Sequence, residues 1–177
     1  FCPSEIDMSI RPGWFYHPEE EPHSLERLFR TYINSVGGNT AFNLNVPPMP
    51  NGRFDPRDIA RLKELGDKIS SSFAENLCQG AVVTHTVLNS TQCEYLVELD
   101  GEKNIRFFEI EEDISKGQRV SSFRIQSRRN GHWERVYSNY STIGFKRIIE
   151  EDVCCDAFRI VVEASRGEPL ISKIAAY

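Results

Sequence analysis

The chain has 177 residues, of which 40% are hydrophobic, and its formal net charge is −5. This length accommodates one large domain or two small ones with a buried core. Lysine and arginine are scattered along the chain rather than clustered, which argues against a nucleic-acid-binding surface. No apolar run approaches the roughly 20 residues of a membrane-spanning helix. The longest runs, such as residues 158–162, have the length of a strand.

The five cysteines have neither the Cys-x-x-Cys spacing nor the histidine partners of a zinc site, so we expect no metal and no cofactor. Two interpretations stay open for them. They are small buried hydrophobic residues, or some form a disulfide such as Cys78–Cys93.

The first half of the chain alternates strand and helix signals. Residues 6–10 alternate apolar and polar side chains, which predicts a strand that a Pro-Gly pair terminates. From Ser24 to Val36 the apolar residues follow helical spacing, with Ser24 as the N-cap and a Gly-Gly pair as the stop. Residues 42–46 then predict a second strand, which ends at two prolines.

A second helix is predicted after Asp55-Pro56, because aspartate is a good N-cap and proline suits the first helical position. Its inner face consists of apolar residues at helical spacing: Ile59, Leu62, Leu65, Ile69 and Phe73. The βαβα order calls for a parallel sheet or barrel. Four elements do not close a barrel, so we expect the rest of its wall upstream of this chain.

The pattern changes near residues 75–79, where we place a domain boundary between residues 1–77 and 78–177. Beyond it, eight short strand-like runs are separated by turn signals such as Asp100-Gly101. The runs are residues 81–88, 95–99, 105–110, 120–126, 133–137, 143–149, 158–163 and 170–175. Many short strands with regular turns are typical of an antiparallel sandwich or jelly roll.

The loop after the first strand concentrates chemistry-bearing side chains. Seven residues carry an arginine, three aromatics and a histidine, and three glutamates follow. A pocket that cleaves sugars at the C-terminal end of a barrel strand typically combines aromatic side chains, a fixed cation and carboxylates. Crowding of several carboxyl groups beside aromatic side chains is expected to raise the pKa of one of them. A general acid that works at neutral pH requires such a raised pKa.

Residues 9–17, Ser-Ile-Arg-Pro-Gly-Trp-Phe-Tyr-His, resemble a segment of the α-L-fucosidases, glycoside hydrolase family 29. Further matching motifs follow in order at residues 34–37, 45–48, 60–66, 112–114, 117–120, 142–147 and 169–172, and at Tyr177. The resemblance implies the C-terminal βαβα portion of a (β/α)8-like barrel followed by a galactose-binding-like antiparallel β-sandwich. Three departures stand out: Gly38 where the family often has arginine, Asn43 in a usually apolar strand, and a short segment at 80–95.

The resemblance implies a retaining mechanism, which needs two carboxyl groups about 5 Å apart. The family's aspartate nucleophile lies on an earlier barrel strand, so the segment alone is expected to be inactive. The family's acid/base follows the pattern tyrosine, histidine, two residues, glutamate, and counting from Tyr16-His17 selects Glu20. Glu19 and Glu21 flank it, and a solvated acidic loop is the alternative.

Three residues of this loop are candidate substrate-binding residues. Arg11 carries a forked set of donors that could hold a carboxylate or sugar hydroxyls, or form a structural salt bridge. Trp14 could stack on sugar C–H groups or belong to the core. His17 could bond a hydroxyl, orient the glutamate loop, or be an ordinary hydrogen-bonded histidine.

Other polar residues are interpreted as structural. Asp7 is expected to be buried with a partner, and Asn45 to hold the turn at the two prolines that follow it. In the second half, four residues could form a sugar-binding patch, but structural pairing is favoured: Arg119, Trp133, Lys146 and Arg147. Tyr140 and Trp133 are the aromatics that would suit a lectin loop.

The leading hypothesis is a segment of a retaining exo-α-L-fucosidase that acts on a fucosylated glycan or oligosaccharide, with α-1,3/1,4-linked fucose favoured. The alternatives are a carbohydrate-binding sandwich module and a non-catalytic paralogue. No nucleic acid and no membrane span are expected. The oligomeric state stays open, and a secreted or periplasmic location is favoured.

Overall fold

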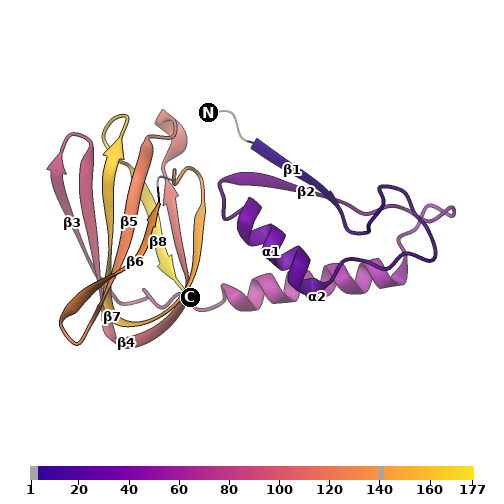
Figure 1. Cartoon of the computed structure of the whole chain (residues 1–177), viewed down its shortest axis with the longest axis horizontal. Helices are drawn as coiled ribbons and strands as arrows, with labels where there is room; N and C mark the ends of the chain where they lie inside the picture. The colour runs from indigo at the N-terminus through magenta and orange to yellow at the C-terminus, as the bar shows by residue number, and fades with distance from the viewer. Residues whose placement is uncertain (1–3, 140–141) are drawn as a thin grey trace. The chain divides into compact units, whose positions relative to one another are not determined.

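The computed structural model describes residues 4–139 and 142–177, and these divide into two compact units between Ala74 and Glu75 (Figure 1). The described residues form eight strands, two α-helices and one 3₁₀ turn, so the chain is mostly β-structure. None of the helices described is long and apolar enough to cross a membrane.

The first unit has the strand–helix–strand–helix order that the sequence predicts. Its elements are β1 (Ser4–Ser9), α1 (Leu25–Ser35), β2 (Thr40–Asn45) and α2 (Pro56–Ser72). The two strands pair in parallel, with Ser4 opposite Thr40 and Ser9 opposite Asn45. Because the strands run the same way, their carboxyl ends lie at the same edge, and the loop that begins at Ile10 starts there.

Both predicted helix starts are confirmed. The Ser24 hydroxyl accepts the backbone N–H of Arg27, and the Asp55 carboxylate accepts that of Arg57. Pro56 occupies the first turn of α2, where its missing N–H costs nothing. These local patterns therefore set where α1 and α2 begin.

The apolar faces of the two helices are covered to different degrees. On α1, Leu28, Phe29 and Ile33 are buried, as the helical spacing predicts. On α2 the predicted inner face is only partly correct, because Leu65 is buried whereas Ile59 is 54% exposed. One helix and two strands offer too little surface to cover the whole face of a 17-residue helix.

Gly38, one of the departures from the family pattern, occupies the tight turn after α1. A Cβ atom added there would lie 2.3 Å from the backbone oxygen of Asn34. Only glycine fits this turn, and its N–H donates to the carbonyl of Ser35 at 2.8 Å.

The second unit is an antiparallel sheet in the order β3-β4-β7-β5-β6, with β8 paired to β4. Its elements are β3 (Val82–Asn89), β4 (Gln92–Glu112), the 3₁₀ turn (Ile114–Lys116), β5 (Val120–Arg129), β6 (His132–Asn139), β7 (Arg147–Ser165) and β8 (Ile171–Ala176). The buried cluster of this unit includes Phe108 and Phe158, whose rings meet edge to face at 5.1 Å.

Four of the predicted short strands are joined into two long ones. The runs at 95–99 and 105–110 both belong to β4, and β7 includes the run at 158–163 and the end of the run at 143–149. The predicted turn at Asp100-Gly101 is instead an irregularity between Glu98 and Lys103, where the β4–β7 register shifts. Pairing on both sides of the irregularity keeps the strand continuous.

The four described cysteines are free, so the Cys78–Cys93 disulfide considered above is wrong. Cys93 and Cys155 are buried in the core cluster, and Cys78 packs against it. Burial raises the pKa of these three thiols to about 11. Cys2 lies outside the described residues. The described thiols thus serve mainly as small core residues.

A buried carboxylate on β4 is neutralised by two lysines. The Glu109 side chain is 4% exposed and lies 2.7 Å from the Nζ of Lys146 and 3.0 Å from that of Lys173. The Tyr177 hydroxyl donates to it at 2.9 Å. Burial alone opposes the charged carboxylate, but these partners outweigh burial and lower the pKa of Glu109 to about 2.

We predict acid destabilisation of the second unit through Glu109. Because its folded-state pKa is depressed from 4.5, its contribution is present above pH 4.5 and is lost as the pH falls towards 2. At about 1.4 kcal/mol per pKa unit, the contribution is on the order of 3 kcal/mol. Urea unfolding between pH 7 and pH 2.5, followed by Trp133 fluorescence in a Trp14→Phe background, measures this change.

Glu109→Gln should lower stability at pH 7 and flatten this pH dependence. Glu150→Gln is the control, because Glu150 pairs at 3.0 Å with Arg106 of β4, the strand that carries Glu109, in a more exposed position. Equal pH profiles for the parent and Glu109→Gln would contradict the assignment.

Candidate functional site

The loop between β1 and α1 begins at the shared carboxyl edge of the parallel strands. The N–H of Ile10 donates to the carbonyl of Asn45 at 2.9 Å and so extends the pairing by one bond. The loop closes where the N–H of His23 donates to the carbonyl of Ile10 at 2.7 Å. Both ends of the loop are thus fixed at one point beside the end of β1.

Arg11 is the centre of this loop, and its side chain is fully buried. Its Nε lies 3.0 and 2.9 Å from the two carboxylate oxygens of Asp58, which is also fully buried. Its Nη1 donates to the backbone oxygens of His17, at 3.0 Å, and Glu20. Its Nη2 lies 3.2 Å from Asp55. Of the two roles considered for Arg11, the geometry favours the structural ion pair.

The start of α2 holds the loop from the other side. Arg57 bonds the carboxylates of Asp55, at 2.8 Å, and Glu21, at 2.5 Å, and donates to the backbone oxygen of Pro18 at 2.9 Å. The Tyr16 hydroxyl donates to Asp55 at 3.1 Å. Hydrogen bonds from Arg57, with a smaller contribution from Tyr16, hold the pKa of Asp55 well below its usual range. Asp55 therefore caps the helix and anchors the loop at once.

Asn45 contributes a further bond to the loop. Its side-chain amide donates to the Ser9 hydroxyl at 3.1 Å and to the backbone oxygen of Trp14 at 3.0 Å. The prediction that Asn45 holds the proline turn after it is corrected here, because its amide is directed at the neighbouring strand and loop. Strand β2 thus positions the aromatic segment that follows β1.

The three glutamates of the loop lie in different surroundings. The Glu19 side chain is 74% exposed, 3.9 Å from the Nδ1 of His17. Glu21 is bonded to Arg57. Glu20 is half-buried, and its carboxylate accepts the N–H of Gly13 at 3.3 Å. A Cβ at Gly13 would lie 3.3 Å from that carboxylate, so glycine leaves room for it. Glu20 is therefore folded back over the start of the loop.

The candidate binding side chains Trp14 and His17 are accessible. Trp14 is 55% exposed and Phe15 is 80% exposed. Tyr16 is half-buried, and the guanidinium carbon of Arg11 lies over its ring, 5.0 Å from the ring centre. The His17 side chain is 55% exposed. Arg11 and Tyr16 form the support of the loop, and the residues on either side of Tyr16 are open to a ligand.

His23 is a member of this region that the sequence analysis missed. It is half-buried, and its pKa is lowered by burial and by Arg27, while Glu20 acts in the opposite direction. Its carbonyl accepts the Nη1 of Arg61 at 2.6 Å. His23 directly precedes the N-cap of α1, a position that carries no sequence signal for function. Its electrostatic interaction with Glu20 arises only when the loop is folded.

Comparison with known proteins gives matches over both units. The family model of α-L-fucosidases matches residues 3–71. α-L-Fucosidase 1 of Arabidopsis thaliana is 34% identical over an alignment that covers all of this chain. The chain is similar to α-L-fucosidases over both of its units. The resemblance on which the sequence analysis relied, to glycoside hydrolase family 29, is thereby confirmed.

Solved family structures agree. The crystal structure of SpGH29 matches with a TM-score of 0.93 and 33% identity over 100% of this chain. A Ruminococcus gnavus GH29 fucosidase in complex with fucose matches with a TM-score of 0.88 and 29% identity over 98% of this chain. The chain spans 41% of the Arabidopsis protein, 44% of SpGH29 and 40% of the R. gnavus chain. It thus spans less than half the length of these fucosidases.

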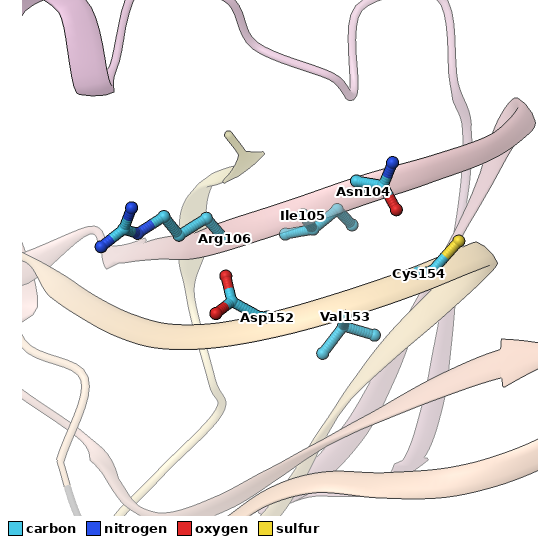
Figure 2. A pocket seen from close by; sticks show the side chains of 6 residues that line it. All are labelled: Asn104, Ile105, Arg106, Asp152, Val153 and Cys154. Carbon is cyan, nitrogen blue, oxygen red and sulfur yellow. The ribbon is translucent and has the colours of Figure 1, made fainter.

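The second unit has a shallow hollow of about 360 Å³ (Figure 2). Three residues of β4 and three of β7 line it: Asn104, Ile105, Arg106, Asp152, Val153 and Cys154. It lies where the β4–β7 register shifts between Ile105 and Phe107. The lining contains no aromatic ring for a sugar to stack on, and the Arg106 guanidinium is bonded to Glu150.

The basic residues considered as a sugar-binding patch are bonded within the second unit. Arg119 donates to the backbone oxygen of Glu168 at 2.9 Å, and Arg147 to that of Thr142 at 2.8 Å. Lys146 is paired with Glu109. These contacts agree with the structural interpretation of the three side chains.

Trp133 is also engaged within the second unit, because the guanidinium carbon of Arg159 lies 4.5 Å from its ring centre. That of Arg128 lies 5.7 Å away. Tyr140, the other aromatic considered for a lectin loop, lies outside the described residues.

Asp7 is corrected in one respect. It has a partner, since the Asn43 amide donates to its carboxylate at 2.9 Å across the strand pair, but it is exposed rather than buried. The same contact explains the polar residue at position 43, which departs from the family pattern. The two form one cross-strand pair.

We predict that Arg11→Met destabilises the first unit by roughly 3–5 kcal/mol, because it leaves the buried carboxylate of Asp58 without its partner. Arg30→Met is the matched control, since Arg30 pairs with Glu26 in an exposed position on α1 and should change stability by less than about 1 kcal/mol. Urea unfolding followed by Trp14 fluorescence in a Trp133→Phe background measures both. Equal effects of the two substitutions would exclude a buried anchor.

Proposed function

We propose that this chain supplies the acid/base loop of a retaining exo-α-L-fucosidase that removes terminal α-linked fucose from glycans, with α-1,3/1,4 linkages favoured. The observation that carries the proposal is the position of Glu20. Its carboxylate lies at the carboxyl end of a parallel strand, held over a glycine, beside an exposed aromatic segment. Catalytic residues of barrel enzymes occupy this end of the strands.

The surroundings support Glu20 over its two neighbours as the acid/base. The charge of Glu21 already balances the Arg57 guanidinium, which makes it a poorer proton donor. Glu19 projects into solvent and has only a long contact, 3.9 Å, with the side chain of His17, which is also exposed. The backbone of Glu20 is fixed through its carbonyl to Arg11, and its carboxylate by the N–H of Gly13. A general acid must be held within hydrogen-bond reach of the leaving oxygen.

In the proposed mechanism, an aspartate nucleophile from the remaining length of the protein attacks the fucose C1 while Glu20 protonates the departing oxygen. The C1–O bond breaks, a covalent fucosyl-enzyme forms, and Glu20, now a carboxylate, takes a proton from the water that hydrolyses it. This division of labour makes the present chain inactive by itself.

The exposed loop residues would meet the substrate. Trp14 offers a flat apolar face to sugar C–H groups, and His17 offers a ring N–H or nitrogen to a hydroxyl. We assign Arg11 to positioning, because its guanidinium is already bonded to Asp58 and to the carbonyls of His17 and Glu20. Arg11 thereby sets the places of the two residues that act.

For the domains, we propose that residues 1–77 are the C-terminal part of a (β/α)8-like catalytic barrel and residues 78–177 a galactose-binding-like β-sandwich. The parallel β1–β2 pair with its two helices supports the first assignment, and the antiparallel sheet supports the second. Because its basic side chains and Trp133 are engaged within the unit, the second domain is assigned a structural rather than a lectin role.

We predict that Glu20→Ala, made in a protein of full family length that contains this chain, lowers turnover of a fucosylated oligosaccharide about 10²–10⁴-fold. On an aryl α-L-fucoside with a good leaving group, azide should restore part of the rate and yield fucosyl azide, since azide needs no general base. Product analysis and kcat measured with and without azide test this.

Glu19→Ala is the matched control and should keep activity near that of the parent. Rescue of Glu19→Ala instead of Glu20→Ala would move the role by one position. A parent that hydrolyses no fucoside would refute the proposed activity.

We further predict that Gly13→Ala lowers kcat without comparable loss of stability. The new methyl group would lie 3.3 Å from the Glu20 carboxylate and displace it by a few tenths of an ångström, and misplacement of about 1 Å can cost ~10²-fold in rate. Gly66→Ala is the control, because a Cβ there meets nothing within 4 Å on α2 and should stabilise the helix slightly. An unchanged kcat for Gly13→Ala would show that the carboxylate does not act from this position.

A further inference from the structure

The edge strand β3 of the second unit is exposed along its whole length. Four of its apolar side chains are more than half exposed: Val82, Val83, Val87 and Leu88. The strand contains no lysine, acidic residue or proline, the usual devices that stop an edge from pairing with another chain. Its outer N–H and C=O groups therefore form an unprotected template for one more strand.

The core-facing side of the sheet extends onto this edge strand. Val83 and Val87 pair with Val97 and Cys93 of β4, and those two partners are 0% and 1% exposed. Between them, His85 stacks on its partner Tyr95, with ring centres 4.4 Å apart. Because directly paired residues lie on the same face of a sheet, the row of Val83, His85 and Val87 continues the core-facing side of β4. This row is the last one of that side and is left uncovered.

The sequence of β3 is symmetric about His85. Thr84 and Thr86 lie one residue from the histidine on either side, and Val83 and Val87 lie two residues from it. The apolar residues Val82 and Leu88 lie three residues from it. We propose that β3 is a self-association edge, at which two copies of this chain pair antiparallel about a two-fold axis through His85. Residue i of one copy then faces residue 170 − i of its partner.

This register suits the side chains and the backbone together. Valine faces valine on the core side, and threonine faces threonine on the other side, which are favourable cross-strand pairs. The residue numbers of each facing pair add up to 170, an even number. Residues whose N–H and C=O groups point away from β4 therefore face residues whose groups also point away from β4, so the two strands can hydrogen-bond. A slip by two residues would place Val83 opposite His85. The bulge between Val87 and Asn89 ends the regular stretch.

The size of the contact predicts a weak dimer. One added strand pair buries less surface than the roughly 1,200–2,000 Å² of stable interfaces. We therefore expect a dissociation constant in the micromolar range, which corresponds to a binding free energy on the order of −8 kcal/mol. A two-fold contact closes on itself, so it produces dimers and not filaments. Both copies would gain cover for the apolar row of β3.

Sedimentation equilibrium of the full chain at about 1–200 µM tests the proposal. We expect a monomer–dimer equilibrium, and we expect Val83→Lys to weaken dimerisation at least 10-fold, because each substituted side chain would face Val87 of the other copy. Ile59→Lys is the matched control on α2, where the replaced side chain is 54% exposed, and it should leave the equilibrium unchanged. A monomer at every concentration, or a dimer unaffected by Val83→Lys, would overturn the proposal.

The register has a test of its own. In the doubly substituted chain V83K/V87E, the two new charges of one copy face their opposites in the other, so dimerisation should return. V83K/V87K should abolish it. If V83K loses dimerisation and V83K/V87E does not regain it, the pairing about His85 is overturned.

Thermal unfolding shows whether each variant is folded. If the lysine variants do not fold, His85→Cys should give a cross-linked dimer on oxidation that the parent chain and Thr84→Cys do not give. Absence of that cross-link would equally overturn the proposal.

Discussion

The buried ion pair of Arg11 and Asp58 is the interaction on which the candidate site depends. Two charges removed from water are costly unless they are paired and hydrogen-bonded. Here the guanidinium donates to the Asp58 carboxylate and to two backbone oxygens, and it lies 3.2 Å from the Asp55 carboxylate. These bonds join the end of β1 to the start of α2 across 47 positions of sequence. The backbone positions of His17 and Glu20 follow from this anchor, because the loop has no regular structure to hold them.

Local signals in the sequence predicted the local parts of the fold. The Ser24 cap, the Asp55-Pro56 start and the alternation in β1 and β2 each involve residues a few positions apart, so pattern reasoning found them. Arg11 and its partner Asp58 are 47 positions apart, and Asn45 and the Trp14 carbonyl are 31 positions apart, so no local rule connects them. Glu20 was selected by the spacing of a family motif, whereas its contact with Gly13 emerges only when the loop is folded.

The second unit shows how pairing between strands can override a turn signal. Asp100-Gly101 is a strong local turn pattern, yet β4 continues through it because β7 pairs with it on both sides. Carboxylates that would be costly to bury are used to join loops. The Glu112 carboxylate accepts the N–H groups of Arg119, Val120 and Gly144 and so ties two loops to the end of β4.

The clamp between the loop and the start of α2 also determines how the first unit can fluctuate. Opening the loop at Arg11 would leave Asp58 buried with an unpaired charge and would remove Tyr16 from the carboxylate that caps the helix. The loop and the first turn of α2 therefore open together or not at all, as one cooperative unit. An irregular surface segment of this kind should exchange its amide hydrogens as slowly as the helix that anchors it. The flexibility of the candidate site is thus governed by a helix that carries none of the candidate catalytic or substrate-binding residues.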